Sequence, residues 1–166
     1  LFRAPMQAEV LRQIAAQGSK GFYQSDITVD LVSSLQELGG VHTLADFEDV
    51  SVQYVDPIYA ALEDGSTLIE LPPNGQGITA IMMKKLMELC HIERFKADSF
   101  ERVHLEAEIA KIAYSARNNF IGDPNFSKIK QNIFTDETYL KQLSREISLG
   151  ELLSDNLDYD FFTRNK

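Results

Sequence analysis

Apolar residues recur at helical spacing through most of the chain. The pattern predicts helices over residues 5–17, from Ser25 to the Gly39-Gly40 pair, over 78–91, over 99–118 and over 135–147. Ser25 is a good N-terminal cap, and Gly18 and Gly39 are placed to end the first two helices. Thr43 and Asp46 have the spacing of a capping box, which predicts one further short helical turn.

Alternation of apolar and polar residues is confined to the middle of the chain. Residues 50–54 read Val-Ser-Val-Gln-Tyr and predict a strand, which Pro57 interrupts. Asp64-Gly65 predicts a turn before a second strand over 67–71. The expected fold class is therefore α+β, mainly α-helical with a small β-sheet portion. The polar and aromatic tail over 155–166 is typical of a linker, or of a strand whose partner is missing.

The length and composition predict a single domain over residues 1–166. Apolar residues make up 44% and charged residues 25% of the chain, close to ordinary globular averages, so a core is expected without disulfides or metal. No stretch approaches the ~18 apolar residues that span a bilayer, and the start has no signal-peptide pattern. The chain begins with Leu1 rather than Met, which we interpret as a segment of a longer protein. The sequence therefore gives no indication of the cellular compartment of the protein.

The net charge is −9, from 16 Lys plus Arg and 25 Asp plus Glu, and it is unevenly distributed. Residues 41–70 contain seven acidic residues and no Lys or Arg. A negative field repels phosphate backbones, so neither nucleic acid nor an anionic membrane is an expected partner. The acids lack the close spacing of a Ca²⁺ loop. A solvated acidic surface is the favoured interpretation, and a surface for cations or a basic partner is the alternative.

Two groups of residues raise the question of catalysis. Cys90, the only cysteine, lies among apolar residues, which favours a buried structural thiol; on a helix, the neighbouring His91 projects about 100° away. His104 and Glu108 are four residues apart and can form a hydrogen bond across one helical turn. A structural contact is favoured over an acid-base pair or a metal site, because the zinc pattern on a helix needs two histidines. The residues alone indicate no catalytic, cofactor-binding or metal-ligating side chain.

Two further features of the sequence predict structural roles. Glu106 and Arg117 fall within the apolar arc of the 99–118 helix, so both are predicted to be buried, about 16 Å apart along the axis. The glycine-containing stretch from Leu71 to Gly77 leads into a helix. It lacks the spacing of phosphate-binding loops, so a tight structural turn is favoured over a nucleotide site.

Several short motifs, taken in order, resemble the γ-glutamyltranspeptidase family over roughly residues 2–147, in the later part of its large subunit. They are Leu11-x-x-Ile14-Ala15-x-x-Gly18, Gly21-Phe22-Tyr23, Gly39-Gly40-Val41-x-Thr43-Leu44-x-Asp46, the Leu71 to Gly77 turn, His104-x-x-x-Glu108-x-x-Lys111, and Arg117 with Gly122-Asp123-Pro124. The form of the turn from Pro72 to Gly77 is similar to that of the acylase-like branch. Ala116 departs from the Asp that usually precedes the family arginine, so no Asp–Arg pair is carried over.

This resemblance implies an Ntn hydrolase, an N-terminal-nucleophile enzyme of αββα architecture whose precursor cuts itself into two subunits. The freed N-terminal Thr of the small subunit would attack a γ-glutamyl amide, with its own α-amine as the base. The implied partners are the remainder of the large subunit and the small catalytic subunit. None of the chain's seven threonines stands in the expected context, so no catalytic residue, cofactor or metal is assigned.

The expected function is thus a scaffold segment of a γ-glutamyltranspeptidase-like enzyme that is inactive alone. One alternative is a non-enzymatic helical interaction module that keeps the family's scaffold. Another is an acylase of the same family that acts on other amides. Exposed apolar faces of such a segment also predict a possible homodimer.

Overall fold

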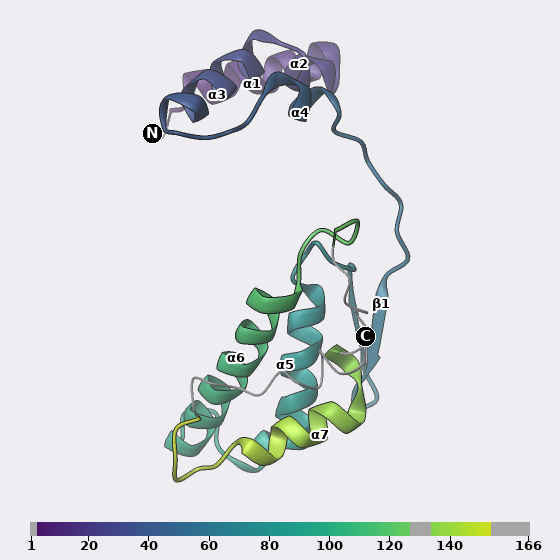
Figure 1. Ribbon diagram of the computed structural model, residues 1–166, viewed down its shortest axis with the longest axis vertical. Coiled ribbons are helices and arrows are strands. Elements are labelled where there is room, and N and C mark those ends of the chain that lie inside the picture. The colour runs from purple at the N-terminus through teal and green to yellow at the C-terminus, as the bar shows by residue number, and fades with distance from the viewer. Residues whose placement is uncertain (1–2, 127–133, 154–166) are drawn as a thin grey trace. The chain divides into compact units, whose positions relative to one another are not determined.

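The computed structural model describes residues 3–126 and 134–153, and its contacts divide the chain into two compact units (Figure 1). The division falls between Tyr54 and Val55. Each unit has helices of its own, so each is described in turn. The expectation of one domain over 1–166 stays a prediction, and the tail over 155–166 lies outside the described residues.

The first unit is helical. It contains α1 (Pro5–Gln17), α2 (Lys20–Tyr23), α3 (Asp26–Glu37) and α4 (Leu44–Glu48). The Ser25 hydroxyl accepts a hydrogen bond from the Ile27 backbone N–H at 3.3 Å and caps α3, as predicted. At the start of α4, the Thr43 backbone N–H donates to Asp46 Oδ2 at 2.7 Å, which confirms the capping box. Hydrogen bonds from Thr43 lower the pKa of Asp46 from its ordinary 3.8.

A close approach between α1 and α2 explains one glycine of this unit. A Cβ placed on Gly21 would lie 2.3 Å from the Gln13 carbonyl oxygen in α1, closer than any real contact. Only a residue without a side chain allows the backbone of α2 to approach α1 this closely. The Gly21-Phe22-Tyr23 motif therefore has a packing role.

The second unit combines a hairpin with helices. Its elements are β1 (Ile58–Ala61), β2 (Thr67–Glu70), α5 (Gly77–Leu89), the 3₁₀ turn η1 (Ile92–Arg94), α6 (Phe100–Phe120) and α7 (Glu137–Glu146). The two strands are antiparallel, and Tyr59 lies opposite Ile69. Helix α5 contacts both strands, α6 and α7, so it is the central element of the unit (Figure 1).

The first predicted strand is wrong. Residues 50–54 have no regular structure, and the first strand begins only at Ile58, after Pro57. Val52 and Tyr54 are almost fully exposed, so their alternation buries no face. The second strand is confirmed at Thr67–Glu70, and Gly65 provides the turn with a φ of +82°. Alternation of residue types predicts a strand only where a partner strand is present to pair with it.

The core of the second unit forms where α5, α6 and α7 meet. Its fully buried residues include Ile78, Met82, Leu86, Ile109, Ile112, Ala113, Ala116, Phe134, Tyr139 and Leu140. Mainly helical structure with one two-stranded sheet confirms the expected fold class over the described residues. In this part of the chain, no helix is both long enough and apolar enough to cross a membrane.

Candidate functional site

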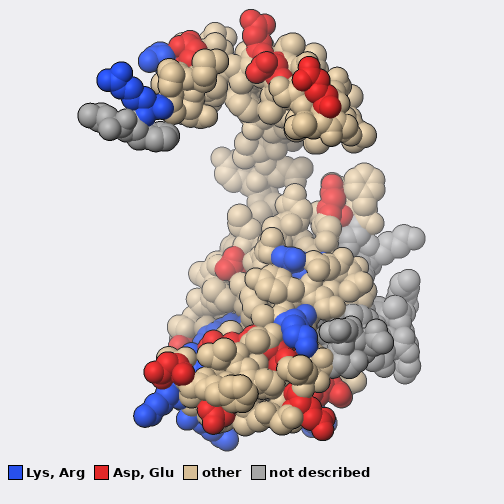
Figure 2. All heavy atoms as spheres, turned by 90° about the vertical axis from the view of Figure 1, so that its left-hand side faces the viewer, with Lys and Arg blue, Asp and Glu red and all other residues tan. Residues whose placement is uncertain are grey.

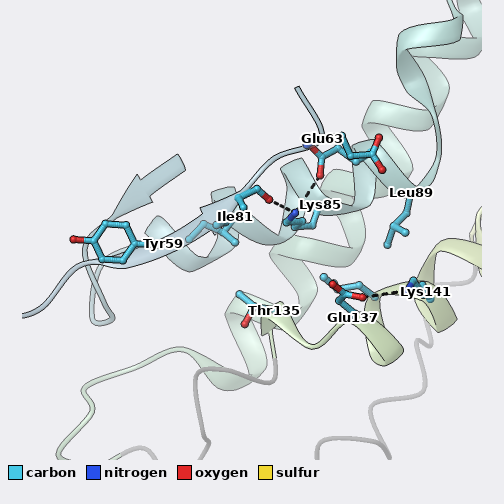
Figure 3. A pocket seen from close by; sticks show the side chains of 12 residues that line it. Tyr59, Glu63, Ile81, Lys85, Leu89, Thr135, Glu137 and Lys141 are labelled. Atoms are coloured by element: carbon cyan, nitrogen blue, oxygen red, sulfur yellow. Dashed lines mark hydrogen bonds and ion pairs between the residues drawn. The ribbon is translucent and has the colours of Figure 1, made fainter. Parts of the chain in front are cut away.

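The second unit contains a pocket of about 510 Å³ between β1, α5 and the start of α7 (Figure 3). Its apolar lining includes Ala60, Ile81 and Leu140, and its rim is charged. The described residues that line it are Tyr59, Ala60, Ala61, Glu63, Ile81, Lys85, Glu88, Leu89, Thr135, Glu137, Leu140 and Lys141. Among these residues the hydroxyl groups are those of Tyr59 and Thr135, and Thr135 is an internal residue without the free α-amine that would serve as its base.

The charged groups of the pocket contact one another. Lys85 Nζ donates to the Ala61 carbonyl and lies 3.3 Å from Glu88 Oε2. Glu88 Oε1 accepts the Glu63 backbone N–H at 2.9 Å, so the carboxylate of α5 holds the chain that leaves β1 (Figure 3). These groups are partners in packing the hairpin onto α5. Sequence reasoning did not single them out, although the i, i+3 spacing of Lys85 and Glu88 is that of a helical ion pair.

A polar stripe on α6, formed by His104, Glu108 and Lys111, holds the segment that follows α7. His104 Nε2 lies 2.8 Å from the Ser148 carbonyl oxygen. Glu108 Oε2 accepts the Leu153 backbone N–H at 2.8 Å, and Lys111 Nζ donates to the Leu153 carbonyl at 3.0 Å. Both backbone groups of Leu153 are thereby satisfied by side chains of α6. The predicted direct bond between His104 and Glu108 is replaced by these contacts, because the backbone of the covering segment needs partners.

Glu108 is the buried acid of α6, with only 2% of the residue exposed. Its carboxylate is 3.3 Å from Lys111 Nζ, which supplies the opposite charge that a buried carboxylate needs. The burial predicted for Glu106 and Arg117 is wrong, since both are partly exposed. Glu106 pairs with Arg102 at 2.8 Å on the surface. Helical spacing alone did not show that a later segment covers the stripe.

Replacing Glu108 with Gln is expected to speed exchange of the Leu153 amide hydrogen about fivefold. A hydrogen bond to a charged acceptor stabilises by about 1 kcal/mol more than one to a neutral acceptor, and about 1 kcal/mol corresponds to a factor of about five in the opening equilibrium. Hydrogen exchange measured by NMR gives the rate. Glu106→Gln on the same helix is the matched control and is expected to leave this amide unchanged. Unchanged protection of Leu153 in Glu108→Gln would contradict the assignment.

The turn from Leu71 to Gly77 is tied to the end of α6. Arg117 Nη1 donates to Gln76 Oε1 at 2.9 Å, and its guanidinium lies 4.6 Å from the centre of the Tyr114 ring. A Cβ on Gly77 would lie 2.6 Å from the Cβ of Glu70. Two motifs 41 residues apart in the sequence, the turn and the family arginine, thus meet through one hydrogen bond. This arrangement supports the prediction of a structural turn.

The surroundings of Cys90 are those of a structural residue. Cys90 is half-buried against the core at the end of α5, and burial raises the pKa of its thiol, as expected for a structural cysteine.

The acidic residues of 41–70 are divided between the two units. On the face of the second unit that Figure 2 shows, Lys and Arg side chains lie among the acids. No group of three or more His, Cys, Asp or Glu in the described part of the chain is arranged to hold a metal.

Comparison with known proteins gives consistent matches along the chain. A model of the family described as gamma-glutamyltranspeptidase matches residues 1–162. A glutathione hydrolase-like proenzyme of Bacillus subtilis is 31% identical over 140 residues, which cover 84% of this chain and 26% of that protein. A glutathione hydrolase proenzyme of Pseudomonas aeruginosa is 31% identical over 150 residues, covering 89% of this chain and 27% of that protein.

Among solved structures, the gamma-glutamyltranspeptidase of Pseudomonas nitroreducens complexed with L-DON is similar at a TM-score of 0.76. It is 25% identical, and the similarity covers 93% of this chain and 47% of that chain. The chain spans about a quarter of the length of the two curated relatives. Because the family match covers nearly the whole sequence, this chain belongs to the γ-glutamyltranspeptidase family.

Proposed function

We propose that this chain is the scaffold segment of a γ-glutamyltranspeptidase-type enzyme that transfers or hydrolyses γ-glutamyl amides such as glutathione. One observation carries the proposal. The family match covers residues 1–162, whereas the one threonine in the described lining of the pocket, Thr135, is internal and has no free α-amine, and Lys85 is paired with Glu88. The names of the two curated relatives, one a glutathione hydrolase proenzyme and the other a glutathione hydrolase-like proenzyme, support the substrate class.

Acyl transfer needs a nucleophile, a base within hydrogen-bond reach and donors for the oxyanion. The buried Thr28 hydroxyl donates to the Phe22 carbonyl in the first unit, which is a structural role. Glu108 and His104 contact the backbone of the segment after α7. Each of these groups therefore contributes to packing, so we assign the catalytic residues to polypeptide outside residues 1–166.

The proposed partners are the remainder of the large subunit and the small catalytic subunit of the same precursor. Both curated relatives are named proenzymes, which supports a precursor that is processed. The αββα architecture belongs to this proposal as well. In it, the helices of this chain would cover the sheet that carries the active site.

Purified chain 1–166 is expected to release no aniline from a γ-glutamyl anilide above the rate in buffer, because the proposal assigns the nucleophile and its base to polypeptide outside this chain. The precursor that contains it, assayed at the same molar concentration, is the positive control and is expected to turn the substrate over. Hydrolysis by 1–166 that disappears when one of its own threonines is replaced would overturn the proposal.

A second candidate is an acylase of the same family, favoured by the form of the Pro72 to Gly77 turn. Profiling the precursor on γ-glutamyl and on other amide substrates separates the two activities. A precursor without turnover on either class would instead support the non-enzymatic helical interaction module.

A further inference from the structure

Two dipeptides of this chain have a sequence that can cyclise spontaneously. They are Asn74-Gly75, in the turn before α5, and Asp64-Gly65, in the loop between β1 and β2. In such a pair the backbone nitrogen of the glycine attacks the side-chain carbonyl carbon of the residue before it, because glycine has no Cβ to hinder the approach. The other asparagines of the sequence are each followed by a residue with a bulkier side chain. These two pairs are therefore the candidate sites of this reaction.

Both pairs are exposed on the second unit, but their hydrogen bonds differ. The Gly65 backbone N–H donates to the Leu62 carbonyl at 3.1 Å. Asp64 Oδ1 accepts from the Ser66 backbone N–H at 2.9 Å and from the Ser66 hydroxyl at 2.6 Å. Both reacting groups of the Asp64-Gly65 pair are thus engaged in other bonds.

The charge of Asp64 adds to this protection. Hydrogen bonds from the Ser66 hydroxyl and backbone N–H lower the pKa of the Asp64 carboxyl from its ordinary 3.8. The carboxylate therefore stays ionised at neutral pH, and its negative charge repels an attacking nucleophile. The uncharged side-chain amide of an asparagine lacks this protection.

In the Asn74-Gly75 pair, both reacting groups are free among the residues that the structure describes. Neither the Gly75 backbone N–H nor the Asn74 side-chain amide has a hydrogen-bond partner there. The space around Gly75 is open, since the nearest atom to an added Cβ is the Pro72 carbonyl oxygen at 3.8 Å. The Gly75 nitrogen can thus approach the Asn74 side chain without breaking a hydrogen bond.

We propose that Asn74 is a site of spontaneous deamidation in this chain, whereas Asp64 is protected by its loop. The Gly75 nitrogen forms a bond to the side-chain carbonyl carbon of Asn74, and the bond from that carbon to the amide nitrogen breaks. Ammonia leaves with the proton that the Gly75 nitrogen gives up, and a cyclic succinimide remains. Water then adds to either ring carbonyl and opens the ring, which gives aspartate or isoaspartate. This inference is independent of the proposed function.

The modified turn is the joint between β2 and α5. Isoaspartate routes the main chain through the side-chain carbon, so it adds one carbon to the backbone at this joint. The joint tolerates little displacement, because a Cβ on Gly77 would lie 2.6 Å from the Cβ of Glu70. Gln76, two residues after Asn74, also accepts the hydrogen bond from Arg117 at 2.9 Å. The isoaspartate form is therefore expected to be less stable than the unmodified chain.

Peptide mapping of the chain 1–166, aged in mildly alkaline buffer, tests the proposal. Cleavage after glutamate places the two pairs on separate peptides, 64–70 and 71–88. Each rate is compared with that of the same chain unfolded in guanidinium chloride, so the intrinsic difference between asparagine and aspartate cancels.

Deamidation in 71–88 is detected as a mass increase of one dalton together with isoaspartate. Its rate in the folded chain is expected within about threefold of the unfolded rate, because no local bond has to open. Isoaspartate in 64–70 is expected to form at least about fivefold more slowly in the folded chain, the effect of one hydrogen bond. Slowing of Asn74 beyond about threefold would refute the proposal, and so would equal folded and unfolded rates at Asp64.

Two variants identify the groups responsible. Gly75→Ala is expected to slow deamidation of Asn74 at least about fivefold, because the added methyl group hinders the attacking nitrogen. Ser66→Ala removes one donor to Asp64 and is expected to speed isoaspartate formation there about fivefold. An unchanged rate in either variant would contradict the role assigned to that group.

The effect on the joint is measured with the aged chain itself. The isoaspartate form, purified by chromatography, is expected to unfold at a lower temperature than the fresh chain. Asn74→Asp carries the same added charge on a backbone of ordinary length, so it is the matched control and is expected to keep the midpoint. Equal midpoints for the isoaspartate form and Asn74→Asp would show that the longer backbone does not disturb the joint, contrary to this inference.

Discussion

The Ile109→Ala variant is expected to lose about 2–5 kcal/mol of its free energy of unfolding. Ile109 is fully buried in α6, in the same core cluster as Met82 of α5 and Leu140 of α7. The loss has two parts, the transfer free energy of the removed methyl groups and the cost of the cavity that they leave. Urea unfolding followed by circular dichroism measures it.

Val103→Ala on the same helix is the matched control for this prediction. Val103 is exposed, so its truncation is expected to change the free energy of unfolding by less than about 0.5 kcal/mol. Equal losses in the two variants would show that α6 does not pack through the face that contains Ile109.

The Gly77→Ala variant is expected to lose about 1–3 kcal/mol, as overpacked positions do. The added Cβ would lie 2.6 Å from the Cβ of Glu70 and 2.8 Å from the Leu71 carbonyl oxygen. Neither atom is the free end of a flexible side chain, so β2 and the start of α5 would have to move apart. Thermal unfolding by circular dichroism reports the loss of stability.

The neighbouring glycine of the same turn offers the control. A Cβ on Gly75 would have its nearest atom, the Pro72 carbonyl oxygen, at 3.8 Å, which is an ordinary contact. Gly75→Ala is therefore expected to be neutral within about 0.5 kcal/mol. If Gly77→Ala unfolded at the same temperature as Gly75→Ala, the close approach of β2 to α5 would be refuted.

Local chemistry explains why most helices were predictable. Ser25 and Thr43 cap α3 and α4, and the periodicity over 5–17 coincides with α1, because these signals involve residues close together in the chain. The strand prediction failed at residues 50–54 for the opposite reason. A strand requires a partner, and the information that Ile58–Ala61 pairs with Thr67–Glu70 lies outside any single stretch.

The polar residues of α6 show the same contrast between what neighbouring residues indicate and what distant segments decide. The sequence places His104, Glu108 and Lys111 four and three residues apart in one motif, and in the structure all three side chains contact the segment that follows α7. Their partners, the backbone groups of Ser148 and Leu153, are more than 40 residues away in the chain. For that reason Glu108 is the buried acid and Glu106 is not.

The sequence by itself determined the longer helices, the caps of α3 and α4 and the family, because periodicity, capping and ordered motifs depend on residues close together in the chain. Only the tertiary structure decided which polar groups are buried, which strands pair and which hairpin face stays exposed. Burial and pairing depend on segments far apart in the chain, and their energies arise only when those segments meet.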